Sequence, residues 1–336
     1  MIEKAIQLAK EKIELPQYII DAVMDEIFCD GVSDSLIELF LTELSKKGET
    51  ASEIAFTSSK LRSMYSSSLK EVDAVEIIGT GGDGSNSFNI STTAAFIAAG
   101  AGIPIIKHGN NASTSLSGSA DVLDKLGVNI HISTEDAFDV FQNIGICFLY
   151  NAQFPSIMKK VAQVRRKLPF VTLFNKTRWI TPANSSMEFL GVYSDELLNT
   201  MSNALENSNL KRATIVHGLD GLDEVSLSDS SKVVDISGNH SSSYIFKPEQ
   251  YDLQLCKKEE LLGGTPVENA SITKNILQGT EKGAKRQISV LNAAFIIRVY
   301  CPNFSLINAI DLANESIDSE NALKKLNALI LATKNC

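Results

Sequence analysis

The chain has 336 residues, of which 44% are apolar, and a formal net charge of −9, so it is long enough for two domains or one large one with a sizeable core. Because an acidic surface repels nucleic acid and anionic lipid, and no segment reads as a secretory signal or a membrane span, we expect neither nucleic acid nor a membrane as a partner. The five cysteines form no CxxC pair, a pattern typical of reduced thiols in the cytoplasm.

The first seventy or so residues are predicted to form helices. Apolar residues recur at helical spacing in three places: Ile2, Ala5, Ile6 and Ala9; then Ile20, Val23, Met24 and Ile27; then Ile37, Phe40, Leu41 and Leu44. Gly48 can end the third helix in a left-handed conformation, and Thr50-x-x-Glu53 predicts a capping box that opens a fourth. This part of the chain shows no strand pattern.

From Val72 onward, short β-branched runs alternate with helical stretches. The runs predicted as strands are VDAVEII, IPIIKH, VNIHI, ICFLY, FVTLF, FLGVY and ATIVHG. Strands that alternate with helices indicate βαβ units around a mostly parallel sheet, so the fold class is α/β. After Val225 the segment SLSDSSKVVDISGNHSSSYIF favours short antiparallel strands, and the end of the chain is helical again.

A glycine-rich loop follows the first predicted strand, in IIGTGGDGSNSFNISTT. The strand ends at Ile78, and a helix is expected to begin near Ser91 or Thr92. Glycines let backbone N–H groups approach a ligand, and a helix N-terminus adds positive charge, so this loop predicts a phosphate or diphosphate site. It lacks the lysine of an ATP-binding P-loop and the acidic ribose partner of a dinucleotide site. The alternative is a tight turn without a ligand, but the polar residues around the glycines make that less favoured.

A second loop and a carboxylate pair follow later strands. Lys107 stands at the end of a strand in KHGN, and Asp223 and Glu224 follow another strand in VHGLDGLDEVS. Loops at the carboxyl ends of parallel strands collect the ligand in α/β sheets, and adjacent carboxylates suit Mg²⁺. A solvated lysine and an acidic surface turn are the alternatives. The metal is favoured because a diphosphate bound to an acidic protein needs neutralisation.

Taken together, these motifs resemble the anthranilate phosphoribosyltransferase family. The resemblance rests on GTGGDG, FNIST, KHGN, SGSADVLDKLG, DEVS, GGTPVENA and AIDLANESIDSENALKKL, and covers nearly the whole chain. It implies a helical domain at 1–70, joined by helices within about 135–168, and an α/β domain of the nucleoside phosphorylase and phosphoribosyltransferase type at 71–336. It also implies a homodimer formed through the helical domain.

The same resemblance implies a reaction and its residues. The family transfers the phosphoribosyl group of phosphoribosyl diphosphate to anthranilate, an aromatic amine, in tryptophan biosynthesis, with Mg²⁺ and without a protein nucleophile. Phosphoribosyl diphosphate would be held by Gly79, Thr80, Gly82, Asp83, Ser87, Asn89, Ser91, Thr92, Lys107 and Ser119. The acceptor would contact Gly79, His108, Asn110 and Arg165, and Mg²⁺ would be held by Ser91, Asp223 and Glu224.

Several positions depart from the family pattern, mostly on the acceptor side. Asn111 and Leu116 stand where the family has an arginine and a lysine, and Pro155 stands where it has a histidine. Arg178 and Trp179 lie near the position of its Gly-Pro pair. Two alternatives therefore stay open: a paralogue with a different acceptor, and a non-catalytic relative that acts as a binding protein. Pyrimidine nucleoside phosphorylases share a related fold, but their phosphate loop fits these motifs less well.

Overall fold

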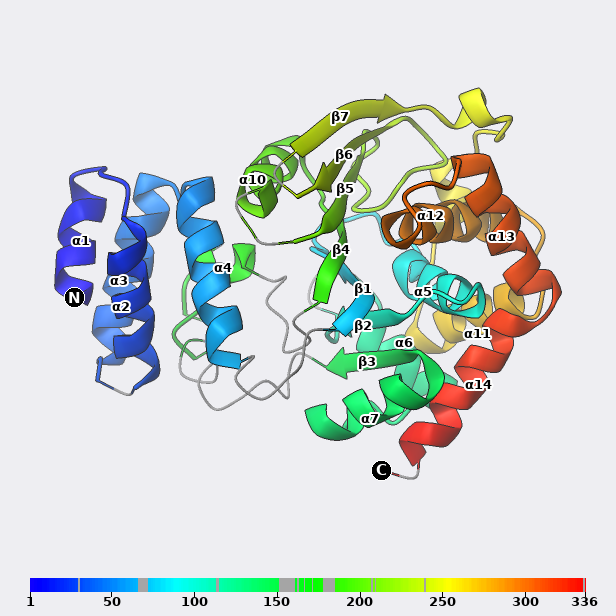
Figure 1. Cartoon of the computed structure of the whole chain (residues 1–336), viewed down its shortest axis with the longest axis horizontal. Helices are drawn as coiled ribbons and strands as arrows, with labels where there is room; N and C mark the ends of the chain where they lie inside the picture. The colour runs from blue at the N-terminus through cyan, green and yellow to red at the C-terminus, as the bar shows by residue number, and fades with distance from the viewer. Residues whose placement is uncertain are drawn as a thin grey trace. The chain divides into compact units, whose positions relative to one another are not determined.

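The computed structural model divides the chain into two compact units (Figure 1). It describes residues 1–29, 31–65, 72–112, 115–150, 161, 163–165, 167–170, 172–177, 185–206, 208, 210–238, 240–334 and 336. The first unit comprises Met1–Glu71, Phe154–Asn184 and Asn203–Asn209, and the second comprises the remainder. None of the helices in the described ranges is long and apolar enough to cross a membrane. All five cysteines are free thiols.

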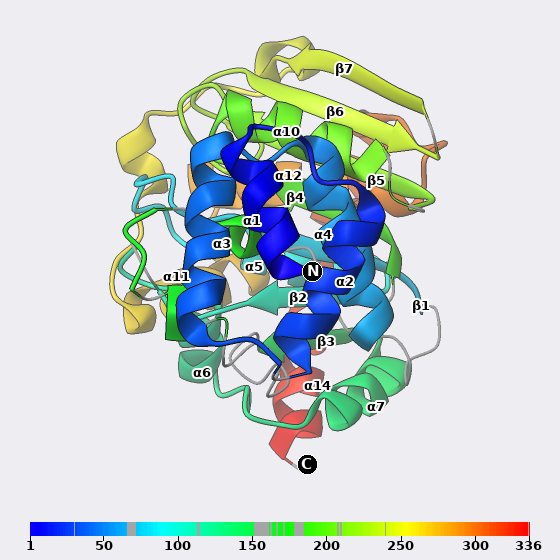
Figure 2. The ribbon, with the colours of Figure 1, turned by 90° about the vertical axis from the view of Figure 1, so that its left-hand side faces the viewer.

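The first unit is helical, and its principal helices lie side by side (Figure 2). Its described helices are α1 (Ile2–Lys10), α2 (Gln17–Phe28), α3 (Asp34–Lys47), α4 (Ala51–Tyr65) and the short α9 (Leu173–Lys176). The predicted apolar faces are buried; Ile37 and Phe40 are 0% exposed. The prediction of a strand at FVTLF is wrong for its last two residues, because Leu173 and Phe174 begin α9. Phe174 packs edge-on against Phe28, with ring centroids 6.3 Å apart.

The predicted capping box at the start of α4 is confirmed, and its glutamate does more than cap the helix. The backbone N–H of Thr50 donates to Glu53 Oε2 at 2.9 Å, and the N–H of Glu53 donates to Thr50 Oγ1 at 3.2 Å. Glu53 is fully buried, accepts a bond from the Leu15 N–H at 2.8 Å, and pairs with Lys47 at 2.8 Å. One carboxylate thus ties the start of α4 to α3 and to the loop after α1.

We expect Glu53→Ala to lower the free energy of unfolding of the helical unit by about 3 kcal/mol, because it leaves the buried ammonium of Lys47 without its partner. Chemical denaturation measures the change. Glu43→Ala is the control, since the Glu43–Lys46 pair includes a largely exposed lysine and should contribute less than about 0.5 kcal/mol. Equal effects of the two substitutions would contradict the role given to Glu53.

The second unit is built on a seven-stranded sheet in the order β3-β2-β1-β4-β5-β6-β7 (Figure 1). The strands are β1 (Val72–Gly79), β2 (Ile105–Gly109), β3 (Ile146–Tyr150), β4 (Ser185–Gly191), β5 (Arg212–Gly218), β6 (Ser231–Ser237) and β7 (His240–Phe246). The first five in this order pair in parallel, and β6 and β7 add antiparallel to β5. The predicted α/β class and the antiparallel strands after Val225 are confirmed.

Helices complete the second unit. They are α5 (Ile90–Gly100), α6 (Ser119–Leu126), α7 (Thr134–Ile144), α10 (Asp195–Glu206), α11 (Pro266–Leu277), α12 (Ala284–Tyr300), α13 (Leu306–Asp318) and α14 (Asn321–Lys334), with 3₁₀ turns η3 (Pro248–Tyr251) and η4 (Lys258–Leu261). The last four residues of α10 group with the first unit. Helices α5 and α12 pack on the sheet, and α13 and α14 pack on α5 (Figure 1).

One expectation about the segment after α6 needs correction. VNIHI is a turn and not a strand, because Gly127 ends α6 at φ +95° and the N–H of Asn129 donates to Thr333 Oγ1 at 3.1 Å instead of to a neighbouring strand. The alternation of buried and exposed side chains in VNIHI is produced by this turn. The range 135–168 was expected to contain helices that join the helical domain. Of this range, the part up to Gln153 groups with the second unit, where α7 packs on β3 and α14, and the part from Phe154 groups with the first.

Candidate anion and metal site

The glycine-rich loop leaves the sheet from an inner strand, because β1 lies between β2 and β4. The N–H of Thr80 donates to the carbonyl of Gly191 at 2.9 Å, which extends the pairing with β4. Gly81 and Gly82 have φ values of +60° and +85°, a region that side chains disfavour. The following helix begins at Ile90, slightly before the predicted start. The loop and the N-terminus of α5 therefore carry the backbone N–H groups expected of an anion site.

The carboxylates of Asp83, Asp223 and Glu224 meet beside this loop. Each offers an oxygen, and these oxygens all lie within 4.8 Å of one another. Asp223 Oδ2 also accepts a bond from the N–H of Gly81 at 2.7 Å. A Cβ on Gly191 would lie 1.7 Å from the Asp223 carbonyl oxygen, so this close approach requires glycine. Sequence reasoning gave Asp83 to the diphosphate and did not join it to the other two carboxylates.

Burial sets the charge state of this cluster. It raises the pKa of Asp223 to about 6, helped by the nearby charge of Asp83, and it raises the pKa of Glu224 well above its usual range. Burial lowers the pKa of Lys107 to about 8, against the opposing charges of Asp223 and Glu224. Closely spaced oxygen ligands with excess negative charge fit Mg²⁺. Within the described residues, this donor set matches the metal that the sequence predicts.

The chelated protein should lose stability as the pH rises. Folding raises the pKa of Asp223 from 3.8 to about 6. The stability that the protonated Asp223 contributes is therefore fully present below pH 3.8, and it is lost as the pH rises through about 6. The loss should be on the order of 3 kcal/mol. Because Mg²⁺ binds the ionised carboxylates, it should raise the Tm more at pH 8 than at pH 5. Melting curves with EDTA and with excess Mg²⁺ measure this, and an equal shift at both pH values would contradict it.

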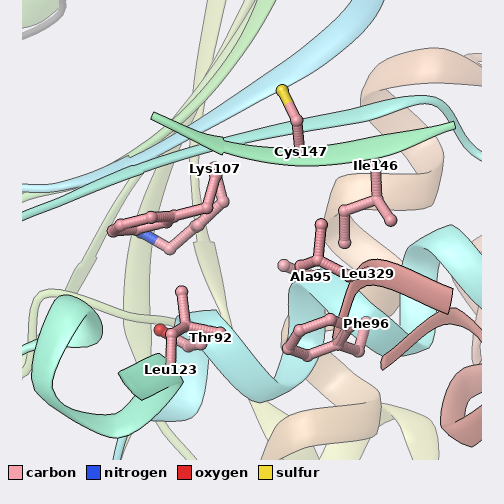
Figure 3. Close-up of a pocket in the computed structure, with 9 residues that line it drawn as sticks. Thr92, Ala95, Phe96, Lys107, Leu123, Ile146, Cys147 and Leu329 are labelled. Carbon is pink, nitrogen blue, oxygen red and sulfur yellow. The ribbon is translucent and has the colours of Figure 1, made fainter. Parts of the chain in front are cut away.

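Lys107 lies in the middle of β2 and is held by backbone carbonyl groups. Its Nζ donates to the carbonyl of His108 at 2.7 Å, and the side chain is 5% exposed. Lys107 and Thr92 also line a cavity of about 10 Å³ together with apolar residues such as Phe96 and Leu123 (Figure 3). A cavity of this size holds at most about one water molecule. It therefore serves packing rather than ligand binding, and this apolar surrounding accounts for the lowered pKa of Lys107.

His108 was predicted to contact the acceptor, but its side chain pairs with a residue inside the second unit. Its Nε2 pairs with Glu76 Oε1 on β1 at 2.8 Å, and both side chains are 1% exposed. The side chain is thus occupied inside the second unit, and a contact with an acceptor would have to come from the His108 backbone. Asn110, two residues on, is exposed. Ser119 begins α6 and packs against Gly109, where a Cβ would lie 1.7 Å from Ser119 Oγ.

Asp121 organises the second loop, a role that sequence reasoning missed. Asp121 Oδ2 accepts bonds from the N–H groups of Ala112 at 2.8 Å and Gly118 at 2.9 Å. Asp121 Oδ1 accepts from Asn111 Nδ2 at 2.5 Å, and the hydroxyl of Tyr150 donates to Asn111 Oδ1. Burial opposes ionisation of Asp121, but these hydrogen bonds lower its pKa. A neutral Asn111 is therefore built into this loop, at a position where the chain departs from the arginine of the family pattern.

The remaining predicted residues are placed as follows. Ser91 lies half-buried in the first turn of α5, and Ser87 Oγ accepts from Ser85 Oγ at 3.1 Å within the glycine-rich loop. Asn89 precedes α5, and Leu116 is 63% exposed. Arg165 belongs to the first unit, so its acceptor role stays a prediction. Pro155, Arg178 and Trp179 lie outside the described residues.

Comparison with known proteins gives one consistent picture. Residues 71–323 match the model of the glycosyl transferase family, a/b domain. The anthranilate phosphoribosyltransferase of Lachnoclostridium phytofermentans is 41% identical over 331 residues, which cover 98% of each chain. That of Endomicrobium trichonymphae is 42% identical over 312 residues, which cover 93% of each chain.

Solved structures agree with this picture. The crystal structure of anthranilate phosphoribosyltransferase from Thermus thermophilus has a TM-score of 0.88 at 31% identity, covering 98% of this chain and 99% of that one. The enzyme from Saccharomyces cerevisiae, in complex with PRPP and Mg, has a TM-score of 0.81 at 28% identity, covering 95% of this chain and 92% of that one.

Proposed function

The chain belongs to the anthranilate phosphoribosyltransferase family, and we propose that it transfers the phosphoribosyl group of phosphoribosyl diphosphate to anthranilate, releasing diphosphate. The observation that carries this proposal is the cluster of Asp83, Asp223 and Glu224 beside a loop of backbone N–H groups, with Gly81 bonded to Asp223. Carboxylates that repel a diphosphate on their own become part of its site once a cation lies between them. The full-length similarity to enzymes of this name supports the same reaction.

The proposed residues divide into three groups. We assign Mg²⁺ to Asp223 and Glu224 with Ser91, and Asp83 stands close enough to take part. Phosphoribosyl diphosphate is assigned to residues of the two loops and of the helices that follow them: Gly79, Thr80, Gly82, Asp83, Ser87, Asn89, Ser91, Thr92, Lys107 and Ser119. The acceptor is assigned to Gly79, Asn110 and Arg165, and to the backbone of His108.

In the reaction, the bond between C1 of the ribose and the diphosphate oxygen breaks, and its electron pair stays on the diphosphate. When bound, Mg²⁺ would supply charge neutralisation for that leaving group. The loop N–H groups, the N-terminus of α5 and the Lys107 ammonium stabilise the same growing charge. The amine of anthranilate is unprotonated near pH 7, so it attacks C1 without a strong base, and the proton that its nitrogen then loses passes to the released diphosphate or to water. Positioning supplies much of the rate.

We also propose the cytoplasm as the location and a homodimer as the assembly, formed through the part of the helical unit at residues 1–70. Exposed apolar side chains in the first unit support such an interface, since Ile13 is 47% and Tyr18 59% exposed. An acidic chain with free thiols supports the cytoplasm.

The test is a direct assay. The protein is mixed with Mg²⁺, phosphoribosyl diphosphate and anthranilate, and loss of anthranilate fluorescence is followed, with an EDTA-treated control. A panel of other aromatic amines runs beside it, because a neutral Asn111 in place of an arginine favours a second candidate, a paralogue with another acceptor. Turnover of another amine alone would establish that alternative. Phosphoribosyl diphosphate binding without turnover of any amine would indicate a non-catalytic relative.

A further inference from the structure

The segment Leu261–Asn269, which contains the GGTPVEN motif, lies directly against the glycine-rich loop. The N–H of Gly263 donates to the carbonyl of Asn86 at 2.9 Å, and the N–H of Phe88 donates to the carbonyl of Leu261 at 3.1 Å. A Cβ on Gly263 would lie 2.7 Å from the Cα of Phe88, so the two backbones touch only because this residue is glycine. The motif therefore holds the end of the loop from outside.

Asn269, in the first turns of α11, extends this contact to a side chain of the loop. It is 1% exposed. Its Oδ1 accepts from the N–H of Gly264 at 2.8 Å, and its Nδ2 donates to Asn89 Oδ1 at 3.0 Å. Asn89 Nδ2 in turn donates to the carbonyl of Ser117 at 3.2 Å. Two amide side chains thus form a relay between two backbone groups on different loops.

The chemistry of the two ends sets the orientation of both amides. A backbone N–H can only donate, so the amide of Asn269 must turn its oxygen to Gly264 and its nitrogen to Asn89. Asn89 must then present its oxygen to Asn269 and its nitrogen to Ser117, whose carbonyl can only accept. An amide nitrogen carries two N–H groups, and the bond to Ser117 uses one of them. The second N–H is left as a donor of fixed direction.

We propose that Asn269 is a positioning residue, which orients the Asn89 amide so that its second N–H donates to an oxygen of phosphoribosyl diphosphate. This inference rests on the proposed function for the identity of the ligand, while the orientation itself rests on the hydrogen bonds alone. Asn269 acts through Asn89 and does not touch the substrate. The structure thereby gives a role to the GGTPVEN motif, which lies some 180 residues from Asn89 in the sequence.

The test is a double-mutant cycle on substrate affinity. Asn269→Leu keeps the shape of the side chain and removes the relay, and it should weaken phosphoribosyl diphosphate binding about tenfold, as expected for a lost hydrogen bond to a charged group. Asn89→Ala should weaken binding at least as much. The double variant should bind no worse than Asn89→Ala, because Asn269 then has nothing left to orient. Effects that multiply, or unchanged affinity in Asn269→Leu, would overturn the proposal.

Two further measurements separate orientation from folding and from the proposed function. The NMR signals of the Asn89 side-chain amide should shift and lose protection from exchange in Asn269→Leu, and unchanged signals would refute the relay whatever the protein binds.

Ser316→Ala is the matched control, since it removes a buried hydrogen bond to the carbonyl of Ile97 (2.7 Å), near the other end of α5, and should leave affinity unchanged. Asn269→Ser serves the same cycle if Asn269→Leu does not fold. Wild-type protein that binds no phosphoribosyl diphosphate would count against the proposed function, with the relay still judged by the NMR signals.

Discussion

Asp223→Asn combined with Glu224→Gln should reduce kcat/KM on the order of 10³-fold, because the double variant removes both charges that we assign to Mg²⁺. The same change should leave the Tm unchanged or raise it, since burial already raises the pKa of both carboxyls and their ionised forms oppose folding. Steady-state kinetics at several Mg²⁺ concentrations and melting curves measure the two effects. Calorimetry should show that phosphoribosyl diphosphate binding no longer depends on Mg²⁺.

The control for this variant is Asp229→Asn, which changes an exposed carboxylate a few residues further along the chain. It should leave kcat/KM within about twofold of the wild type and the free energy of unfolding within about 0.5 kcal/mol, as for most surface substitutions. If the double variant kept its activity, the metal would have to be held elsewhere. If its Tm collapsed, the carboxylates would have a structural role, and the loss of activity would say nothing about the metal.

Lys107→Met should reduce kcat/KM by about 10²-fold, because it removes a buried charge that we assign to the leaving diphosphate while keeping most of the unbranched side chain. The folded protein should tolerate the change, since burial lowers the pKa of Lys107 to about 8 and the charged form therefore costs stability. Methionine also suits the small apolar cavity that the lysine stem lines.

The pH profile distinguishes a charge effect from a packing effect. The ammonium of Lys107 is present below its pKa of about 8 and is lost above it, so the wild-type kcat/KM should fall as the pH rises through about 8. Lys107→Met should lack this fall of kcat/KM at high pH. Lys125→Met, which changes an exposed lysine on α6, should retain it. If Lys107→Met kept the fall of kcat/KM at high pH that the wild type shows, the titration would belong to another group.

Local patterns in the sequence determined much of the fold. The apolar spacing of Ile37, Phe40 and Leu41 marks one face of α3, and Thr50 with Glu53 marks the start of α4, because both signals act within a few residues of the chain. The two loops were also predictable, since glycine density and the end of a β-branched run are local properties. The neighbouring Asp223 and Glu224 were interpreted as a metal pair only together with the two loops, because an acidic pair by itself is more typical of a surface turn.

Short apolar runs in this sequence do not distinguish a strand from other structures. VNIHI and FVTLF have strand-like composition, yet Val128–Ile132 forms a turn and Leu173 begins a helix. A run of five residues carries too few repeats to separate a strand from a turn that buries alternate side chains. The outcome depended on a neighbouring glycine with positive φ at Gly127 and on a hydrogen bond from α14, which no local pattern records.

Only the tertiary structure decided which polar groups meet. Asp83 joins Asp223 and Glu224 from a loop about 140 residues earlier, His108 turns inward to Glu76, and Asn269 reaches Asn89. Each of these pairs depends on the order of strands in the sheet and on which helix packs beside which loop. The sequence by itself predicted an anion site and a metal site, because residue types and local turns carry that chemistry. The partners of each side chain were decided by strand order and packing, because groups far apart in the chain come within hydrogen-bonding distance only after the whole unit has folded.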